Sequence, residues 1–205
     1  MSSSEHPWEE EQLKFNPPRL AGSDRPALLF LDLETTGLDP EQGVILEIAA
    51  VAVNERLEAL RSCAFLIRHE VYPLSEWCLV QHRESGLLNA CAQSEFNTRD
   101  AEISIIKFCE IFAPRNDWGE PAVEAIKPII LAGDSIHFDR AWIKKHMRQL
   151  ERILHYRMVD VSTLKELHRI FNLPAAPEEG LPHRALADCL RSIDKLKFYT
   201  GGWAR

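Results

Sequence analysis

The sequence predicts an α/β fold in which a mixed sheet is flanked by helices. Three strand-like segments come first, at residues 27–34, 44–54 and 59–68, and helical and strand-like segments alternate after them. This order is typical of a sheet that carries helices on its faces. The length of 205 residues suits one domain with a sizeable hydrophobic core.

The first two strands differ in their hydrophobic patterns. Leu29, Leu31 and Leu33 fall on one face of the first strand, because side chains two residues apart in a strand point the same way. The second strand, VILEIAAVAVN at 44–54, is apolar almost throughout, which is typical of a strand covered on both faces. We therefore expect the second strand to be buried on both sides.

Helices and short strands alternate in the remainder of the chain. A helix is expected from about 99 to 112, followed by a loop with two prolines at 113–127 and a short buried strand at 128–133. The segment 134–150 is expected to be helical, because its apolar residues recur at helical spacing. These residues are Ile136, Ile143, Met147 and Leu150.

Two more helices are expected near the C-terminus. After a short strand at 158–161, Thr163 and Glu166 form a capping-box pattern that opens a helix ending at about 171. A proline-rich loop at 174–182 leads to the last helix. The apolar stripe of that helix consists of Leu186, Leu190, Ile193 and Leu196.

The terminus and the composition limit the classes of protein. Residues 1–26 are polar and contain proline, so we expect a disordered tail before a folded domain at 27–205. The acidic N-terminus lacks the basic flank of a secretory signal, and no apolar run is long enough to span a membrane.

The five cysteines form no C-x-x-C pair, which favours reduced thiols and a cytoplasmic protein. A net charge of −7 argues against sequence-independent binding to long DNA or RNA but is compatible with a small nucleic-acid substrate.

Two acidic side chains interrupt the first strand near its end, in LFLDLETTGLDP at 29–40. Asp32 and Glu34 share a face of the strand and lie about 6–7 Å apart along the backbone. Like charges this close repel each other unless a cation lies between them. The segment has two interpretations, a strand that runs into a polar turn or half of a metal site.

Three further candidate residues stand at the ends of later elements. Asp139 lies early in the helix at 134–150, whereas His183 and Asp188 lie at the junction between the last loop and the last helix. A single Asp on a helix is usually a surface residue. The combination of four acids and one histidine at element ends favours the metal site.

Four segments of the chain resemble oligoribonuclease, a family of 3′-to-5′ exonucleases. The segments are DLETTGLDP…ILEIA, GDSIHFDRAWI, HYRMVDVSTLKEL and PHRALADCLRSI, and the resemblance extends over nearly all of residues 27–200. The D-x-E and H-x4-D elements are shared by the whole superfamily of exonucleases with four acids and a histidine, the DEDDh group. The HYR…DVSTLKEL segment is more particular to oligoribonuclease.

The resemblance implies a ribonuclease H-like α/β domain with a five-stranded mixed sheet. It also implies two divalent metal ions, Mg²⁺ or Mn²⁺, that are held directly by Asp32, Glu34 and Asp188. Asp139 would complete the shell of the second ion through water, and His183 would take the proton of the attacking water. Hard ions of this kind prefer carboxylate oxygen, and an imidazole titrates near neutral pH.

The resemblance assigns four residues to the bases of a short RNA. Gly37 and Leu38 would lie beside the bases, with Leu38 as an apolar wedge. Trp77 and His82 would face the substrate. Apolar and aromatic side chains contact bases without regard to base identity. These residues would therefore bind the bases of the substrate without a preference for its sequence.

A further group resembles a cap over the 5′ phosphate of a dinucleotide. Ser135 and Arg157 match this phosphate cap, and the fork of an Arg side chain is well shaped for phosphate. The family is a homodimer, so Tyr156, and less closely His155, would help to close the cap of the neighbouring protomer. The cap would restrict the substrate chiefly to dinucleotides, which would be hydrolysed to nucleoside 5′-monophosphates.

The chain departs from the family's pattern near this cap. Asp134 stands where the family usually has Asn. An added acid there would either weaken phosphate binding or form a contact at the helix N-terminus. The loop at 113–127 and the N-terminal tail are longer than the family requires.

Three functions therefore remain open. The first is an oligoribonuclease that cleaves dinucleotides, and the second is a DEDDh exonuclease that acts on longer single strands of DNA or RNA. The third is a nucleotide-binding or scaffold module with an inactive site, which the five intact catalytic residues disfavour. Metal-dependent hydrolysis of any oligonucleotide would exclude the third function.

Overall fold

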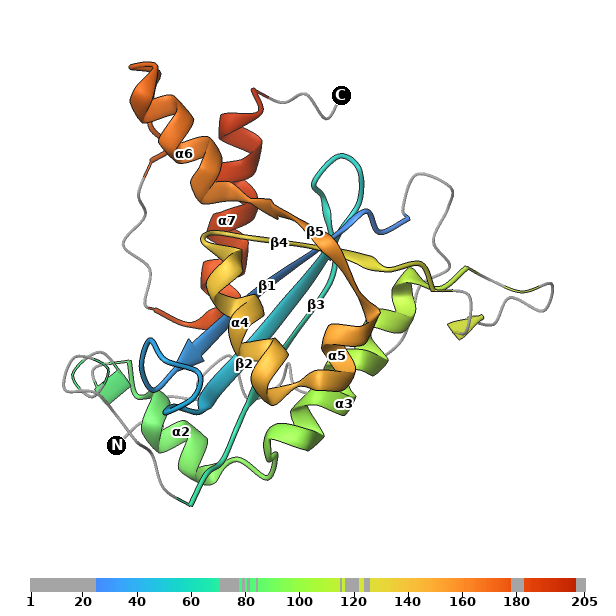
Figure 1. The fold of residues 1–205 in the computed structure, drawn as a ribbon, viewed down its shortest axis with the longest axis vertical. Coiled ribbons are helices and arrows are strands. Elements are labelled where there is room, and N and C mark those ends of the chain that lie inside the picture. The colour runs from blue at the N-terminus through green and yellow to red at the C-terminus, as the bar shows by residue number, and fades with distance from the viewer. Residues whose placement is uncertain are drawn as a thin grey trace, which may run out of the picture.

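Five strands form one mixed sheet at the centre of the molecule (Figure 1). The order across the sheet is β3-β2-β1-β4-β5, with β1 antiparallel to β2, β2 antiparallel to β3, and β4 parallel to both β1 and β5. The predicted five-stranded mixed sheet is confirmed. The strands are β1 (Leu28–Thr35), β2 (Ile45–Val53), β3 (Ala59–Leu66), β4 (Ile129–Gly133) and β5 (Leu154–Asp160).

The computed structural model describes most of the chain. The described residues are 25–70, 78, 80, 82–83, 85–114, 116, 122–123, 126–177 and 183–201. All but two residues of the expected tail at 1–26, and much of the loop at 113–127, lie outside these ranges. No helix within them is long and apolar enough to cross a bilayer.

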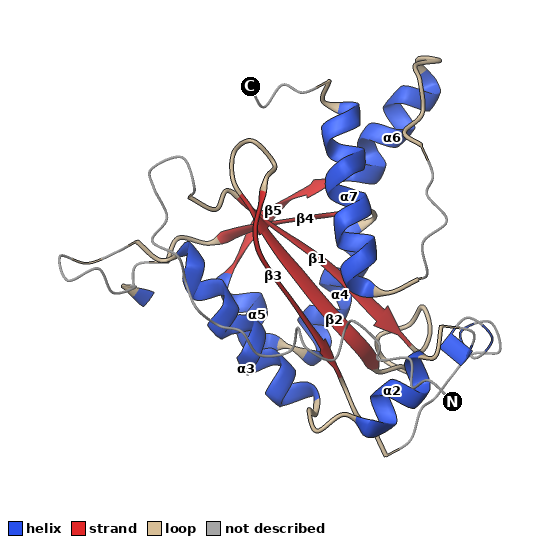
Figure 2. Cartoon of the chain, turned by 180° about the vertical axis from the view of Figure 1, so that it is seen from behind, coloured by secondary structure: helices blue, strands red, loops and turns tan. Residues whose placement is uncertain are grey.

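Helices cover both faces of the sheet (Figures 1 and 2). On one face lie α3, α4 and α5, and the opposite face is covered by α7 with α6 beside it. A short helix, α2, packs near the start of β2. The helices are α2 (Leu87–Gln93), α3 (Thr98–Phe108), the 3-10 helix η2 (Cys109–Phe112), α4 (Ile136–His146), α5 (Arg148–Ile153), α6 (Val161–Ile170) and α7 (Ala185–Tyr199).

Successive side chains of β1 point to opposite faces of the sheet and so pack under different helices. Leu29, Leu31 and Leu33 are buried in the core under α3, α4 and α5, whereas Phe30 is buried in the core under α7. Every residue of β2 is buried, as its continuous apolar pattern predicted. Because side chains alternate along a strand, Asp32 and Glu34 follow Phe30 onto the face that α7 covers.

The helix predicted at 134–150 is interrupted. α4 ends at His146, the buried Met147 breaks the helical path, and α5 starts at Arg148. Oε1 of the buried Glu102 on α3 accepts the backbone N–H groups of Gln149 (2.6 Å) and Leu150 (3.1 Å). These N–H groups would otherwise lack partners at the start of α5, so a distant side chain stabilises the break.

Three smaller sequence predictions near the C-terminus are wrong. β5 begins at Leu154 rather than at 158, because Leu154 already pairs with Ile129 of β4. α6 begins at Val161 with Asp160 as its N-cap, so the capping box expected at 163–166 does not open it. In α7, Leu190 is 44% exposed, and the small buried Cys189 takes its place against the sheet.

Candidate active site

Three carboxylates meet where the end of β1 lies beside the first turn of α7. Asp32 and Glu34 come from β1 and Asp188 from α7, and one oxygen of each lies within 4.8 Å of the others. We call these three residues the acidic cluster. Figure 2 shows α7 crossing the sheet over β1, which explains how residues more than 150 positions apart converge.

Asp139 lies next to the acidic cluster but outside it. The residue is in the first turn of α4, is buried, and accepts a 2.9 Å hydrogen bond on Oδ1 from the backbone N–H of Leu33. This bond ties α4 to β1 between the two acids of the strand. Asp139 is also the strongest charged neighbour acting on the pKa of Asp32, so the structure brings all four predicted acids together.

Burial and mutual repulsion raise the pKa values of these acids. Burial raises the pKa of Glu34 to about 8, and the carboxylates of Glu47 and Asp188 add to the shift. Burial also raises the pKa of Asp139 to about 7. Burial and then the charge of Asp139 raise the pKa of Asp32 well above its usual range. The oxygen donors and their repulsion fit divalent cations such as Mg²⁺ or Mn²⁺, which would offset the negative charge.

The stability of the metal-free protein is therefore expected to fall as the pH rises from about 5 to about 8. Over this range folded Glu34 and Asp139 hold protons that unfolded carboxyl groups, with pKa values of about 4, have already lost. The folded state binds more protons than the unfolded state, so each rise in pH lowers the free energy of unfolding. Thermal melting in a chelator at pH 5 to pH 9 measures the slope, and saturating Mn²⁺ should reduce it. A metal-free melting temperature that increases over this range would contradict the raised pKa values.

His183 is exposed and lies two residues before α7. Its side chain has no hydrogen bond to another described residue. Within α7, Arg191 forms an ion pair with Asp188 one turn away. The imidazole of His183 is therefore open to solvent, while the carboxylate of Asp188 is held on its helix.

His82 is buried against the end of β1, with only 4% of its surface exposed. Its Nε2 lies 2.8 Å from the backbone oxygen of Thr35, and its Nδ1 lies 3.9 Å from Oε2 of Glu34. Burial lowers the pKa of His82, which favours the neutral ring. The sequence led us to expect a ring that faces the substrate. The structure places the ring beside Glu34, so its contact with the substrate stays a prediction, and Trp77 lies outside the described residues.

Leu38 is 81% exposed on the loop that follows β1, and the loop itself is held by several contacts. Thr35 donates through Oγ1 to the Gly37 carbonyl (2.8 Å), and His146 of α4 lies with Nε2 2.8 Å from the Pro40 oxygen. At Gly43 an added Cβ would lie 2.5 Å from the Trp142 ring, so this close approach requires glycine. An exposed apolar side chain thus stands on a fixed loop.

The residues of the predicted phosphate cap lie on the surface at the start of α4 and on β5. Ser135 adopts a left-handed backbone conformation (φ 55°), and its N–H donates to Oδ1 of Asp160 (3.0 Å). The Arg157 guanidinium lies 5.1 Å from the centre of the Tyr156 ring, which is 72% exposed. Asp160, the last residue of β5, thus connects β5 to Ser135 at the start of α4. The same carboxylate also accepts the N–H of Ser162.

Asp134, the acid that departs from the family's pattern, is paired with α7. Its Oδ2 accepts a 2.7 Å hydrogen bond from Nζ of Lys195. The contact at the helix N-terminus that the sequence left open is not formed, because no side chain caps α4 there. The positive charge of Lys195 offsets the added negative charge beside Ser135.

Sequence reasoning missed two acids that organise this region, Glu47 and Asp160. Glu47 is the one charged residue in the apolar strand β2, a signal of the same kind as Asp32 in β1. Asp160 stands directly before a helix and accepts from Ser162, which is the pattern of an N-cap. Both patterns can be read from the sequence, a single acid within an apolar strand and an acid at the start of a helix.

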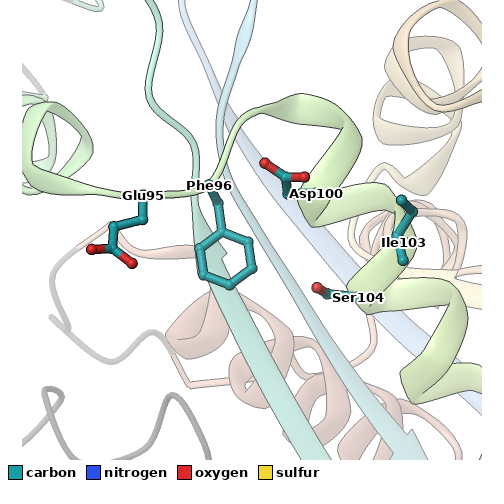
Figure 3. Close-up of a pocket in the computed structure, with 5 residues that line it drawn as sticks. All are labelled: Glu95, Phe96, Asp100, Ile103 and Ser104. Carbon is teal, nitrogen blue, oxygen red and sulfur yellow. The ribbon is translucent and has the colours of Figure 1, made fainter.

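A pocket at the start of α3 is separate from the acidic cluster (Figure 3). Its lining consists of Glu95, Phe96, Asp100, Ile103 and Ser104. Asp100 is already engaged in the capping box of α3. The two acids would repel a phosphate group, so the pocket does not suit a nucleic-acid substrate.

The fold and the site define an exonuclease domain. A family model described as an exonuclease matches residues 29–196. Solved structures of similar fold include Escherichia coli exonuclease I in a zinc-bound complex with single-stranded DNA (TM-score 0.63, 13% identity). Exonuclease I from Methylocaldum szegediense is also similar (TM-score 0.61, 17% identity). These matches cover 87% and 83% of this chain but only 41% and 40% of the longer exonucleases, and they show the fold alone.

Proteins of similar sequence show to which family of exonucleases the chain belongs. An oligoribonuclease of Vibrio campbellii is 37% identical over 179 residues, which cover 84% of this chain and 92% of the relative. An oligoribonuclease of Corynebacterium glutamicum is 37% identical over 198 residues (93% and 84%), and a probable oligoribonuclease of Drosophila melanogaster is 35% identical over 179 residues (84% and 80%). The chain belongs to the oligoribonuclease family.

Proposed function

We propose that the protein is a metal-dependent 3′-to-5′ exoribonuclease that hydrolyses very short RNA, chiefly dinucleotides, to nucleoside 5′-monophosphates. The acidic cluster carries this proposal, because three carboxylates within 4.8 Å of one another occur in a chain of the oligoribonuclease family. Hydrolysis of a phosphodiester develops negative charge on the attacking and leaving oxygens. Divalent ions held by carboxylates neutralise that charge.

The carboxylates would hold two divalent ions, Mg²⁺ or Mn²⁺. Asp32, Glu34 and Asp188 would bind directly, and the position of Asp139 beside the acidic cluster suits a ligand that acts through water. The ions would supply Lewis acidity and charge neutralisation at the scissile phosphate. The raised pKa values of the acids mean that ion binding has to displace protons, which favours binding at higher pH.

His183 would accept the proton of the attacking water. Its ring is exposed, forms no competing hydrogen bond with a described residue, and lies five positions before Asp188 of the acidic cluster in the sequence. A neutral imidazole is an effective proton acceptor near pH 7, and a positioned base of this kind contributes about 10²–10⁴ in rate. His82, buried against Glu34, would act indirectly by supporting that carboxylate.

Leu38 and the adjoining Gly37 would contact the bases of the substrate. The 81% exposure of Leu38 on a held loop suits an apolar wedge, because an exposed leucine gains free energy when a base covers it. Trp77, which lies outside the described residues, would contribute a second apolar surface. These contacts do not depend on base identity, so the enzyme would act on dinucleotides of different sequence.

Ser135, Tyr156 and Arg157 would form the phosphate cap. Arg157 and Ser135 would bind the 5′ phosphate within one protomer, and the exposed Tyr156 would reach the cap of a second copy in a homodimer. The pairing of Asp134 with Lys195 supports the cap, because it offsets a negative charge next to Ser135.

A cytoplasmic location agrees with the buried thiols of Cys91 and Cys109.

Arg157→Ala is expected to reduce cleavage of a dinucleotide about 10- to 100-fold and cleavage of a heptamer far less. The reason is that an Arg–phosphate contact is worth roughly 1.5–3 kcal/mol and is made only when the 5′ phosphate reaches the cap. The measurement is a length series of 5′-labelled RNAs from two to seven nucleotides. The unaltered enzyme should show a sharp fall in rate between two and three nucleotides.

Arg152→Ala is the matched control for this series, because Arg152 is an exposed basic residue on α5 outside the phosphate cap. Its length profile should equal that of the unaltered enzyme. If the unaltered enzyme degrades a heptamer as fast as a dinucleotide, the preference for dinucleotides is wrong.

A DEDDh exonuclease acting on longer single-stranded DNA or RNA is the second candidate function. One observation favours it, since Ser135 and Arg157 are exposed in the single chain, where no described segment closes over them. The same length series decides between the two candidates when it is run on the dimer and on a monomeric variant. A flat profile in both forms supports the second candidate.

A further inference from the structure

We propose that Glu47 and Arg184 act as positioning residues that hold His183 at the acidic cluster, and that Glu47 is not a metal ligand. The inference rests on the proposed function, in which His183 accepts the proton of the attacking water. Neither residue belongs to the four acids and one histidine that define the site. We call the contact between Glu47 and Arg184 the clamp.

Glu47 lies at the centre of the region that the clamp would organise. It is on β2 directly opposite Glu34 of β1, in the register of the antiparallel pair. Its side chain is only 3% exposed. A buried carboxylate at this place adds negative charge beside the acidic cluster, so it requires a strong partner.

Arg184 supplies that partner with a two-pronged contact. Nη2 donates to Oε1 of Glu47 (2.7 Å), and Nε donates to Oε2 (2.9 Å). Oε2 also accepts the backbone N–H of Ala185, the first residue of α7 (3.2 Å). Glu47 therefore binds both the side chain before α7 and the first amide of the helix.

The clamp fixes the chain directly after His183, where α7 begins. Arg184 is the N-cap of α7 and its own side chain does not cap the helix, so Glu47 performs that role from β2. Since the His183 ring has no hydrogen bond to another described residue, its place depends on the backbone that Arg184 anchors. Asp188 is less dependent on the clamp, because Cys189 and Ile193 bury the adjoining face of α7 in the core.

The same contacts exclude Glu47 from metal binding. Both of its oxygens are engaged by the N–H groups of Arg184 and Ala185, at 2.7 to 3.2 Å. A metal ion would have to displace the guanidinium or bind next to its positive charge, and either change is unfavourable. Glu47 thus lies beside the proposed ligands without being one of them.

The test uses Glu47→Gln/Arg184→Met, which removes both charges and nearly conserves side-chain volume. We expect kcat for a dinucleotide to fall about 10- to 100-fold, because a displaced base loses its geometry, while KM changes less than about threefold. Arg169→Met, which removes an exposed guanidinium paired with Glu166 on α6, is the matched control and should leave both constants unchanged.

A double-mutant cycle with His183→Asn separates positioning from a merely structural effect. If the clamp acts through His183, adding the double substitution to His183→Asn should lower kcat less than about twofold further. An equal loss in both backgrounds would overturn the proposal but leave the proposed function intact. If His183→Asn alone leaves kcat unchanged, the role of His183 is wrong and the clamp proposal fails with it.

Mn²⁺ titration by calorimetry tests the claim that Glu47 is not a ligand. The double variant should bind Mn²⁺ within about threefold of the unaltered protein, whereas Asp32→Asn should lose binding. A loss in the double variant that equals the loss in Asp32→Asn would make Glu47 a ligand. Arg184→Lys, which keeps the charge but not the parallel contact, enters the same cycle if the double variant does not fold, with an intermediate loss expected.

Discussion

Asp32→Asn is expected to lower turnover of a dinucleotide about 10³-fold or more while the protein remains folded. The substitution keeps the shape of the side chain but removes the negative charge that a divalent ion requires. It also removes one of several repelling carboxylates that lie within 4.8 Å or beside this group. The metal-free melting temperature near pH 8 should therefore rise by a few degrees, about 2–4 °C for each kcal/mol gained.

Asp194→Asn is the matched control for this substitution. Asp194 is an exposed acid on α7 that pairs only with Lys197 in the described part of the chain, so its loss should change neither turnover nor the metal-free melting temperature. Single-turnover assays at saturating Mg²⁺, and again in excess chelator, measure the effect. Turnover of Asp32→Asn close to that of the unaltered enzyme at saturating Mg²⁺ would remove the metal-based mechanism.

His183→Ala is expected to lower kcat about 10²- to 10⁴-fold with little change in dinucleotide affinity. In the proposed function the ring would accept a proton from the attacking water and would hold neither the metal ions nor the phosphate cap. Because His183 is exposed, the space left by its ring should be open to small molecules. Imidazole in the buffer should therefore restore part of the lost rate.

The imidazole titration is the decisive readout for His183. Restoration should increase with the concentration of the neutral base, and it should be absent for Asp32→Asn, in which the missing group is a proposed metal ligand. Calorimetry should show Mn²⁺ binding unchanged in His183→Ala. If imidazole restores nothing and Mn²⁺ binding is lost, His183 serves the metal site rather than the attacking water.

Patterns that depend on one strand or one helix were predictable from the sequence. The alternation of Leu29, Phe30 and Leu31 places each residue in the expected core, and with them Asp32 on the α7 face. The convergence with Asp188 followed from residue types and the resemblance to a family. Periodicity alone could not supply it, because local spacing says nothing about which helix crosses which strand.

Features that depend on distant partners were not predictable. The break at Met147 is stabilised by Glu102 from another helix, and nothing within 134–150 signals that contact. Leu190 fits the stripe of α7 by spacing, yet Cys189 is the residue that packs against the sheet. The burial of His82 is likewise set by a distant partner, the Thr35 carbonyl 47 positions earlier, and the spacing around His82 does not signal that contact.

The held loop that carries Leu38 has a consequence for the thermodynamics of RNA binding. Ordering a mobile loop costs about 1–2 kcal/mol of backbone entropy for each residue, and a protein that orders its loop only on binding loses that amount from its affinity. Here the contacts of Pro40 with His146 and of Gly37 with Thr35 have already ordered the loop during folding. Loosening it by His146→Ala would therefore make dinucleotide binding entropically less favourable, although His146 is not among the proposed substrate contacts.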